Sequence, residues 1–282
     1  MVTTATAPEA REEGGAGPRS IVITGAAGLV ARGVRPLLRA AGHRLTLIDL
    51  VDPEAAAGET AITASVTDTA AVRAAVDGAD LVVHLGGLSR ERSWAALAEA
   101  NVEGTRSVLE AARDTGVRRV LLASSTHAVG FHPVPAQPVD RLEPRPDGLY
   151  GASKAAMEAL GSVYADRHGL AVVSVRIGTA LARPTTSRML STWLSFPDLA
   201  RLVEAVAVLD EPGARIVWGV SRNTRAWFAH DAGHAIGYHP QDDAEAHAAD
   251  VVPRDVDGVD PDANGLIGGE FASAAHPLGE PW

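Results

Sequence analysis

Tyr150 and Lys154 are four residues apart in a segment, Leu149 to His168, whose pattern predicts a helix. Residues at this spacing share one face of a helix, so the phenol and the ammonium can reach the same site. A cation beside a phenol favours the phenolate and lowers a pKa that is about 10 in water, so the group can act as a base near neutral pH. The chemistry would be removal of a proton from a hydroxyl. A surface lysine one turn from a packed tyrosine is the alternative, because the spacing alone is common.

Lys154 is also singled out by composition. The 25 lysine and arginine residues include only this one lysine. An arginine would replace it poorly, because a planar guanidinium is not a compact charge that can touch a phenol and a ribose hydroxyl together. The composition therefore favours a specific role for Lys154.

The composition of the whole chain limits the classes of function. Its 282 residues suggest one large domain, or one with an appended lobe. A net charge of -10 disfavours a nucleic-acid partner, and the absence of cysteine excludes disulfides, thiolate metal sites and a cysteine nucleophile. Residues 1–18, with Glu9, Glu12 and Glu13, are predicted to be a disordered arm rather than a signal peptide. No apolar run approaches the ~20 residues of a membrane span, so we expect a cytoplasmic protein without a membrane partner.

A strand, a glycine turn and a helix follow one another near the N-terminus. Ser20–Thr24 is a short apolar run typical of a buried strand, and it leads through Gly25 and Gly28 into a helical pattern. Glycines in this context let the backbone approach a pyrophosphate at a helix N-terminus. The next predicted strand, Arg44–Ile48, ends in Asp49, whose carboxylate would bind two ribose hydroxyls and repel a 2'-phosphate. The unit predicts NAD rather than NADP; a glycine turn with a solvated aspartate is the alternative.

Strand and helix patterns continue to alternate. Strands are predicted at 61–64, 81–84 and 119–123, and helices at 68–76 and 94–115. This order predicts an α/β fold, a doubly wound parallel (Rossmann-like) sheet with ligands at the carboxyl ends of its strands. At those ends Gly86 and Gly87 allow close approach of a flat ring, and Ser125 supplies a hydroxyl. A plain turn and a backbone-capping serine are the alternatives.

The remainder of the chain predicts a smaller lobe. A strand at 171–177 and a loop at 178–188 precede a helix at 197–208, a strand at 216–218 and a helix at 226–236. We predict an NAD-binding domain at 19–177, including the catalytic helix, and a small C-terminal substrate-binding lobe with an irregular tail at 178–282. His230, His234, His239 and His247 match no zinc spacing, so no metal is predicted.

The chain resembles the extended short-chain dehydrogenase/reductase family over residues 20–250, through Thr24-Gly25-x-x-Gly28, Asp49, Ser125 and Tyr150-x-x-x-Lys154. Within that family it is similar to the uronate dehydrogenases in four segments: His84-Leu-Gly-Gly87, Arg145 to Lys154, Val175-Arg-Ile-Gly178 and Ser187 to Trp193. The resemblance implies oxidation of the C1 hemiacetal of glucuronate or galacturonate to an aldarolactone, with NAD as the acceptor.

The resemblance also implies roles for individual residues. Tyr150 takes the proton, Lys154 stabilises the phenolate and holds the nicotinamide ribose, and Ser125 orients the reacting oxygen. Besides Lys154, the implied cofactor contacts are Gly25, Gly28, Leu29, Val30, Asp49, Ser65, Val66, Leu85, Gly86, Gly87 and Ile177. The implied substrate contacts are Ser89, Ser125, Thr126, His127, Thr179, Phe271 and, for the carboxylate, Arg188. Phe271 of the tail is expected either to approach the site of a neighbouring subunit in a homo-oligomer or to pack within its own chain.

Three positions depart from the family pattern. Ala31 replaces the third glycine of the turn, Ser65 replaces an aspartate that usually faces the adenine, and Thr126 replaces an asparagine that contacts the sugar. Two other functions stay open: a nucleotide-sugar epimerase or dehydratase, which uses the same tyrosine and lysine, and a non-catalytic NAD-sensing regulator on the same fold. The short lobe argues against the first, and the presence of all three catalytic residue types argues against the second.

Overall fold

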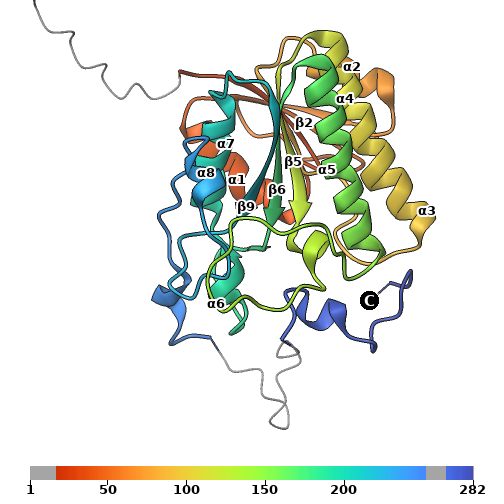
Figure 1. The fold of residues 1–282 in the computed structure, drawn as a ribbon. Coiled ribbons are helices and arrows are strands. Elements are labelled where there is room, and N and C mark those ends of the chain that lie inside the picture. The colour runs from red at the N-terminus through yellow and green to blue at the C-terminus, as the bar shows by residue number, and fades with distance from the viewer. Residues whose placement is uncertain (1–16, 252–264, 282) are drawn as a thin grey trace, which may run out of the picture.

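A seven-stranded parallel β-sheet forms the centre of the molecule (Figure 1). The computed structural model describes residues 17–251 and 265–281. The strands lie in the order β3-β2-β1-β4-β5-β6-β9. Their bounds are β1 (Ser20–Thr24), β2 (Arg44–Asp49), β3 (Glu59–Thr63), β4 (Leu81–His84), β5 (Arg119–Ser125), β6 (Ala171–Ile177) and β9 (Gly213–Gly219). Two short strands, β7 (Thr179–Ala180) and β8 (Trp193–Leu194), pair separately. The predicted doubly wound parallel sheet is confirmed.

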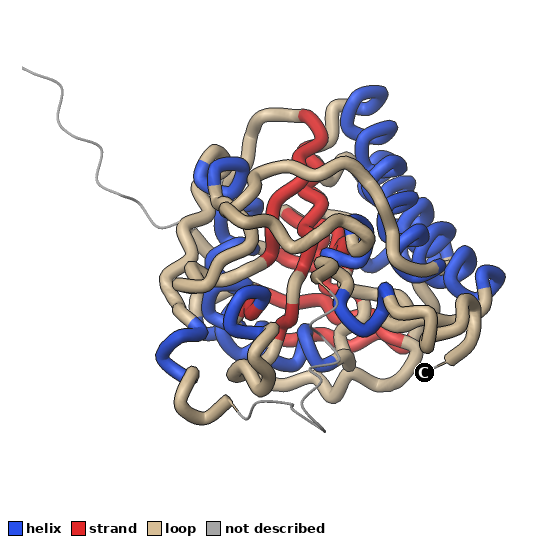
Figure 2. The backbone as a smooth tube through the Cα atoms, turned by 60° about the horizontal axis from the view of Figure 1, so that its bottom comes forward, coloured by secondary structure: helices blue, strands red, loops and turns tan. Residues whose placement is uncertain are grey.

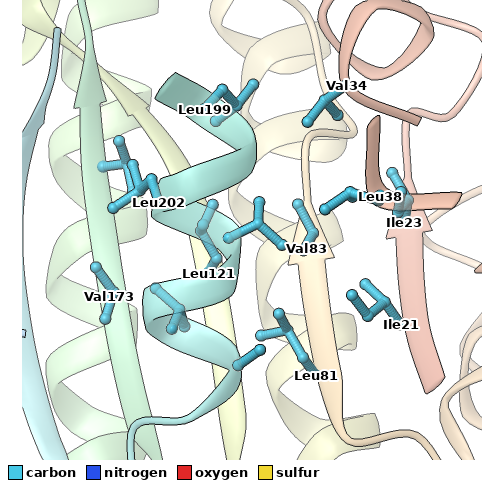
Figure 3. Close-up of a cluster of buried hydrophobic side chains, with 14 of the residues drawn as sticks. Ile21, Ile23, Val34, Leu38, Leu81, Val83, Leu121, Val173, Leu199 and Leu202 are labelled. Atoms are coloured by element: carbon cyan, nitrogen blue, oxygen red, sulfur yellow. The ribbon is translucent and has the colours of Figure 1, made fainter. Parts of the chain in front are cut away.

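Helices cover both faces of this sheet. On one face lie α1 (Leu29–Ala40) and α7 (Phe196–Ala207), and on the other α2 (Thr69–Val76), α4 (Gly104–Thr115) and α5 (Leu149–His168). Figure 3 shows the first layer, in which Leu199 and Leu202 of α7 meet apolar side chains of α1 and of the central strands. Strands with helices on both sides are buried on both faces, which explains their continuous apolar runs.

Loops and short helices cross the carboxyl ends of the strands, at the bottom of Figure 1 and toward the viewer in Figure 2. The short helices there are α3 (Trp94–Leu97), a π-helix (Ala98–Glu103), α6 (Met189–Thr192) and 3-10 turns at Thr126–Val129, Ala244–His247 and Gly269–Ala272. A further short helix, α8 (Asp231–His234), packs beside the edge strand β9. The connections from β1 and from β4 leave toward opposite sides of the sheet, since β1 lies between β2 and β4. Ligands of such sheets bind at this reversal of strand order.

Two predicted helices differ from the observed structure. The helix predicted at 226–236 is wrong, because Phe228 instead pairs with Val139 and stacks on Trp218 at 4.1 Å between ring centroids, leaving only the turn α8 helical. The helix predicted at 94–115 contains the π-helix, whose wider turn carries the buried Asn101. In both places tertiary packing overrides the local pattern.

The observed strand and helix bounds also bear on the predicted lobe. Strand β3 begins two residues before the predicted start at residue 61, and the strand predicted at 216–218 lies in the second half of β9. Because β9 and α7 join the main sheet and its helical layer, residues after 178 contribute to both. The division at 177/178 stays a prediction. The arm predicted at 1–18 lies outside the described residues except for Gly17 and Pro18.

Candidate active site

The turn after β1 brings two strand ends into backbone contact. Gly25 has φ +67°, and a Cβ there would lie 2.7 Å from the backbone of Gly86. A Cβ at Gly86 would in turn lie 2.9 Å from Val66. Asp49, at the end of β2, accepts a hydrogen bond from the backbone N–H of Ala27 at 2.9 Å. The turn therefore requires glycine and holds a carboxylate beside itself, an arrangement that suits a pyrophosphate and a ribose.

A cleft of about 750 Å³ runs along these strand ends. Most of the predicted cofactor residues line it: Gly25, Gly28, Leu29, Val30, Asp49, Ser65, Val66, Leu85, Gly86 and Gly87. The cleft also contains Ser89, which was predicted to contact substrate. Lys154 and Ile177 do not line it. The exposed side chains of Leu29, Leu50 and Val51 surround its outer part. Lining of this kind fits a dinucleotide, and the individual contacts stay predictions.

Ser125, Tyr150 and Lys154 meet beside the end of β5, and all three are buried. The Ser125 hydroxyl lies close enough to the phenol of Tyr150 to lower its pKa. Lys154 donates from Nζ to the Ala123 carbonyl at 2.8 Å, and its Nζ lies 5.7 Å from the centroid of the Tyr150 ring. Helix α5 thus brings the predicted base and cation to the hydroxyl supplied by the neighbouring strand.

The pKa values of this group differ from the sequence-based expectation. Burial raises the pKa of Tyr150 to about 12; the nearby Ser125 hydroxyl opposes that shift and the charge of Asp147 adds to it. Burial also lowers the pKa of Lys154 to about 8. The expectation of a lowered phenol pKa is therefore wrong for the protein alone, because desolvation is the largest influence and the Lys154 ammonium donates to the Ala123 carbonyl.

His127 is fixed on three sides. Its Nδ1 lies 2.6 Å from a carboxylate oxygen of Asp147, its ring packs against the tilted ring of Phe271 at 3.9 Å between centroids, and it meets the Tyr150 ring edge-on at 5.7 Å between centroids. Glycines leave room for Asp147, since a Cβ at Gly130 would lie 1.8 Å from its Oδ2. Phe271 thus packs within its own chain, one of the two arrangements anticipated from the sequence. Its contact brings the tail to the residues around the predicted base.

Arg188 precedes α6 and faces the tail. Its guanidinium donates to the Ile267 carbonyl and lies 5.1 Å from the ring centroid of Trp227. Thr179 follows β6, and its hydroxyl lies 3.2 Å from that of Thr192. The structure therefore places Arg188 against the tail segment that carries Phe271. Their roles toward a substrate stay predictions.

The three departures from the family pattern are accommodated as follows. Ala31 is fully buried in the core between α1 and the sheet, so a methyl group fits there. Ser65 hydrogen-bonds with Thr67 at 2.8 Å and lines the cleft. Thr126 is buried at the start of a 3-10 turn. Among the described residues there is no group of three or more side chains suited to hold a metal ion, and no helix there is both long and apolar enough to cross a bilayer.

Comparison with known proteins agrees with this geometry. The NAD dependent epimerase/dehydratase family matches residues 21–236. The chain belongs to this family. It is 38% identical over 92% of its length to the uronate dehydrogenase of Pseudomonas syringae pv. tomato, 95% of which is covered. It is 35% identical to the NAD-dependent glucose-6-phosphate dehydrogenase of Haloferax volcanii, over 83% of this chain and 98% of that protein. The crystal structure of the uronate dehydrogenase from Agrobacterium tumefaciens matches with a TM-score of 0.83 at 35% identity, over 92% of this chain and 98% of that one.

A buried network that was not predicted from the sequence links the cleft at the strand ends to helix α5. The Thr24 hydroxyl accepts from Gly86 N and lies 2.7 Å from His84 Nδ1, while His84 Nε2 lies 3.1 Å from the Thr105 hydroxyl. Because Thr105 donates its proton to the Asn101 carbonyl, its oxygen must accept from His84 Nε2–H. Burial lowers the pKa of His84 to about 3, so near neutral pH the ring is neutral and carries its proton on Nε2.

Asn101 continues this network to α5. Its side chain accepts from Leu88 N at 2.7 Å and donates to the Leu88 carbonyl and to Ser153, which itself donates to the Tyr150 carbonyl. In the sequence, the position of the polar Asn101 on the apolar face of the helix predicted at 94–115 was the one feature that indicated its part in this network. The network fixes the loop after β4 relative to the start of α5.

We expect the free energy of unfolding to decrease as the pH falls below about 6.5. Burial lowers the pKa of His84 from 6.5 to about 3, so between these values the unfolded chain binds a proton that the folded protein excludes. The stabilisation is complete above pH 6.5 and is lost as the pH falls toward 3. Urea unfolding across this window measures the effect.

His84→Asn is the comparison for this measurement. Asparagine is neutral at every pH in the window, so the variant should start less stable yet lose less stability on acidification. Equal slopes for the two proteins would assign the pH dependence to other groups.

Proposed function

We propose that the protein oxidises a hexuronic acid, glucuronate or galacturonate, at C1 to the aldarolactone with NAD. The observation that carries the proposal is the meeting of Ser125, Tyr150 and Lys154 beside a cleft whose glycines and Asp49 suit a dinucleotide. The extensive similarity to uronate dehydrogenases supports the choice of substrate. A cytoplasmic location and a homo-oligomeric state stay predictions.

In this mechanism each catalytic residue acts on the C1 hydroxyl. Ser125 holds the reacting oxygen, and Tyr150 takes its proton as the C1–O bond becomes the lactone carbonyl. Lys154 stabilises the phenolate and positions the ribose. NAD, when bound, accepts the hydride from C1. Because burial holds the phenol pKa near 12 in the protein alone, the base becomes effective only in the loaded site.

Residues outside the catalytic group account for binding in this proposal. Asp49 accepts hydrogen bonds from the adenosine ribose, and the turn from Gly25 to Gly28 approaches the pyrophosphate. His127, held by Asp147 and Phe271, presents its remaining ring nitrogen to a sugar hydroxyl. Arg188 pairs with the carboxylate that distinguishes a uronate from its parent sugar.

The direct test follows NADH absorbance with purified protein and a panel of substrates. Glucuronate and galacturonate should be turned over with much higher kcat/KM than glucose, arabinose or glucose 6-phosphate. A preference for glucose 6-phosphate would move the assignment toward the Haloferax relative. Conversion of a UDP-sugar without net NADH formation would support an epimerase or dehydratase, and binding of NAD without any turnover would support a regulator.

We expect Asp49→Asn to reduce the preference for NAD over NADP by roughly tenfold or more. The change removes the negative charge that repels a 2'-phosphate, and repulsion between like charges costs more than the 1.4 kcal/mol that equals one decade. The amide oxygen can still accept from Ala27 N, so the turn stays supported. The ratio of kcat/KM for the two cofactors measures the effect.

Asp52→Asn is the matched control for this experiment. Asp52 is exposed three residues along the same loop and only accepts from Glu54 N. It should keep the wild-type cofactor ratio. Equal use of NAD and NADP by the wild type would contradict the role of Asp49.

A further inference from the structure

Glu91 lies in the loop between β4 and α3 and is 3% exposed. Its two carboxylate oxygens accept from the first two N–H groups of α5: Oε1 from Leu149 at 3.0 Å and Oε2 from Tyr150 at 2.9 Å. Gly148, at the N-cap position, has no side chain to do this, and a Cβ there would lie 2.7 Å from Glu91 Oε2. The catalytic helix is therefore capped by a side chain from a different part of the chain.

This cap has a physical reason. The first N–H groups of a helix lack partners within it, and the positive end of the helix dipole favours a negative charge. A buried carboxylate, in turn, needs hydrogen bonds to offset its lost hydration. Glu91 and the start of α5 satisfy each other, and one of the bonds is to the backbone of Tyr150 itself.

Glu91 also holds the C-terminal tail. The same oxygen that accepts from Leu149, Oε1, accepts from Gly279 N at 2.9 Å. At its other end, Ile267 N donates to the His132 carbonyl and Gly268 N to the Gly130 carbonyl. Between these anchors Phe271 packs against His127, and the carbonyl of the anchor residue Ile267 accepts the Arg188 hydrogen bond described above. Figure 1 shows this segment across the lower end of the molecule, near the start of α5.

We infer that Glu91 is a positioning residue that couples docking of the tail, residues 265–281, to the placement of Tyr150. One carboxylate serves both elements, so loss of either donor weakens the anchor of the other. The tail carries contacts to His127 and Arg188, so the same coupling connects the substrate side of the site to its base. This inference rests on the proposed function only for its kinetic consequence; the coupling itself is a property of the protein without substrate.

Two full-length variants test it. Glu91→Gln replaces one acceptor oxygen by an NH2 group that faces N–H donors, so at least one donor loses its partner. Gly279→Pro leaves Glu91 intact but removes the tail donor, and proline cannot adopt the φ of +79° found at Gly279. Glu211→Gln, a change at a side chain that is 87% exposed, is the control.

Hydrogen exchange read by mass spectrometry, with steady-state kinetics beside it, gives the outcome. In Gly279→Pro we expect at least tenfold faster exchange in the first turn of α5, far from the substitution in sequence, and in Glu91→Gln at least tenfold faster exchange in residues 265–281. Both variants should lose at least tenfold in kcat/KM for the uronate with NAD affinity unchanged, and the control should match the wild type.

The coupling is overturned if Gly279→Pro leaves the first turn of α5 as protected as in the wild type, or if Glu91→Gln leaves the tail fully protected. Because exchange is read without substrate, it separates this inference from the proposed function. A wild-type protein inactive on every uronate would overturn the function while the exchange data still decide the coupling.

Discussion

Tyr150→Phe should reduce kcat for the uronate by at least about 100-fold, the loss typical of removing a general base. The substitution keeps the buried ring and its edge contact with His127 and removes only the hydroxyl near Ser125. NAD affinity should stay unchanged, because Tyr150 does not line the cofactor cleft. Steady-state kinetics and NAD titration of the same preparation measure both quantities.

Tyr164→Phe provides the matched control. Tyr164 lies on the same helix, α5, and its hydroxyl reaches only Glu110 at 3.3 Å, on the side that packs against α4. Its removal should leave kcat nearly as in the wild type. Near-normal turnover in Tyr150→Phe would contradict the mechanism, since no other phenol lies beside Ser125 in the described part of the chain.

Arg188→Leu should reduce kcat/KM for glucuronate by at least about tenfold. A charge-assisted hydrogen bond contributes roughly 1.5 to 3 kcal/mol, and 1.4 kcal/mol corresponds to one decade. Arg188→Lys should restore only part of this, because an ammonium cannot present two parallel donors to a carboxylate. The ratio of kcat/KM for glucuronate over glucose is the measurement that isolates the carboxylate.

This ratio matters because Arg188 also contacts the tail. Loss of its hydrogen bond to the Ile267 carbonyl and of its contact with Trp227 should impair every substrate, whereas loss of a carboxylate partner impairs only the uronate. Arg183→Leu, an exposed change in the same loop, controls for the loss of a positive charge. If Arg188→Leu keeps the wild-type preference for glucuronate over glucose, Arg188 does not bind the carboxylate.

Much of the fold follows from local rules that the sequence alone carries. Apolar runs followed by helical patterns predicted the parallel sheet, since strands covered on both faces need apolar side chains on both. Gly25 and Asp49 could be predicted as cofactor residues from the sequence. A strand, a glycine turn and a helix in succession place the turn beside the end of the next strand, where Asp49 lies. Tyr150 and Lys154 share a face of α5 for a similar reason, the fixed helical repeat.

Tertiary structure alone decided the environment of those groups. Burial reversed the expected pKa shift of Tyr150, and the degree of burial depends on elements far away in the sequence. Phe228 is not helical as predicted, because it stacks on Trp218 and its backbone pairs with Val139. Glu91 caps α5 only because the loop that carries it, 58 residues before Leu149, folds back onto the start of that helix. The sequence determined which groups can do the chemistry; long-range packing, which no local pattern encodes, determined their charge, their partners and the place of the tail.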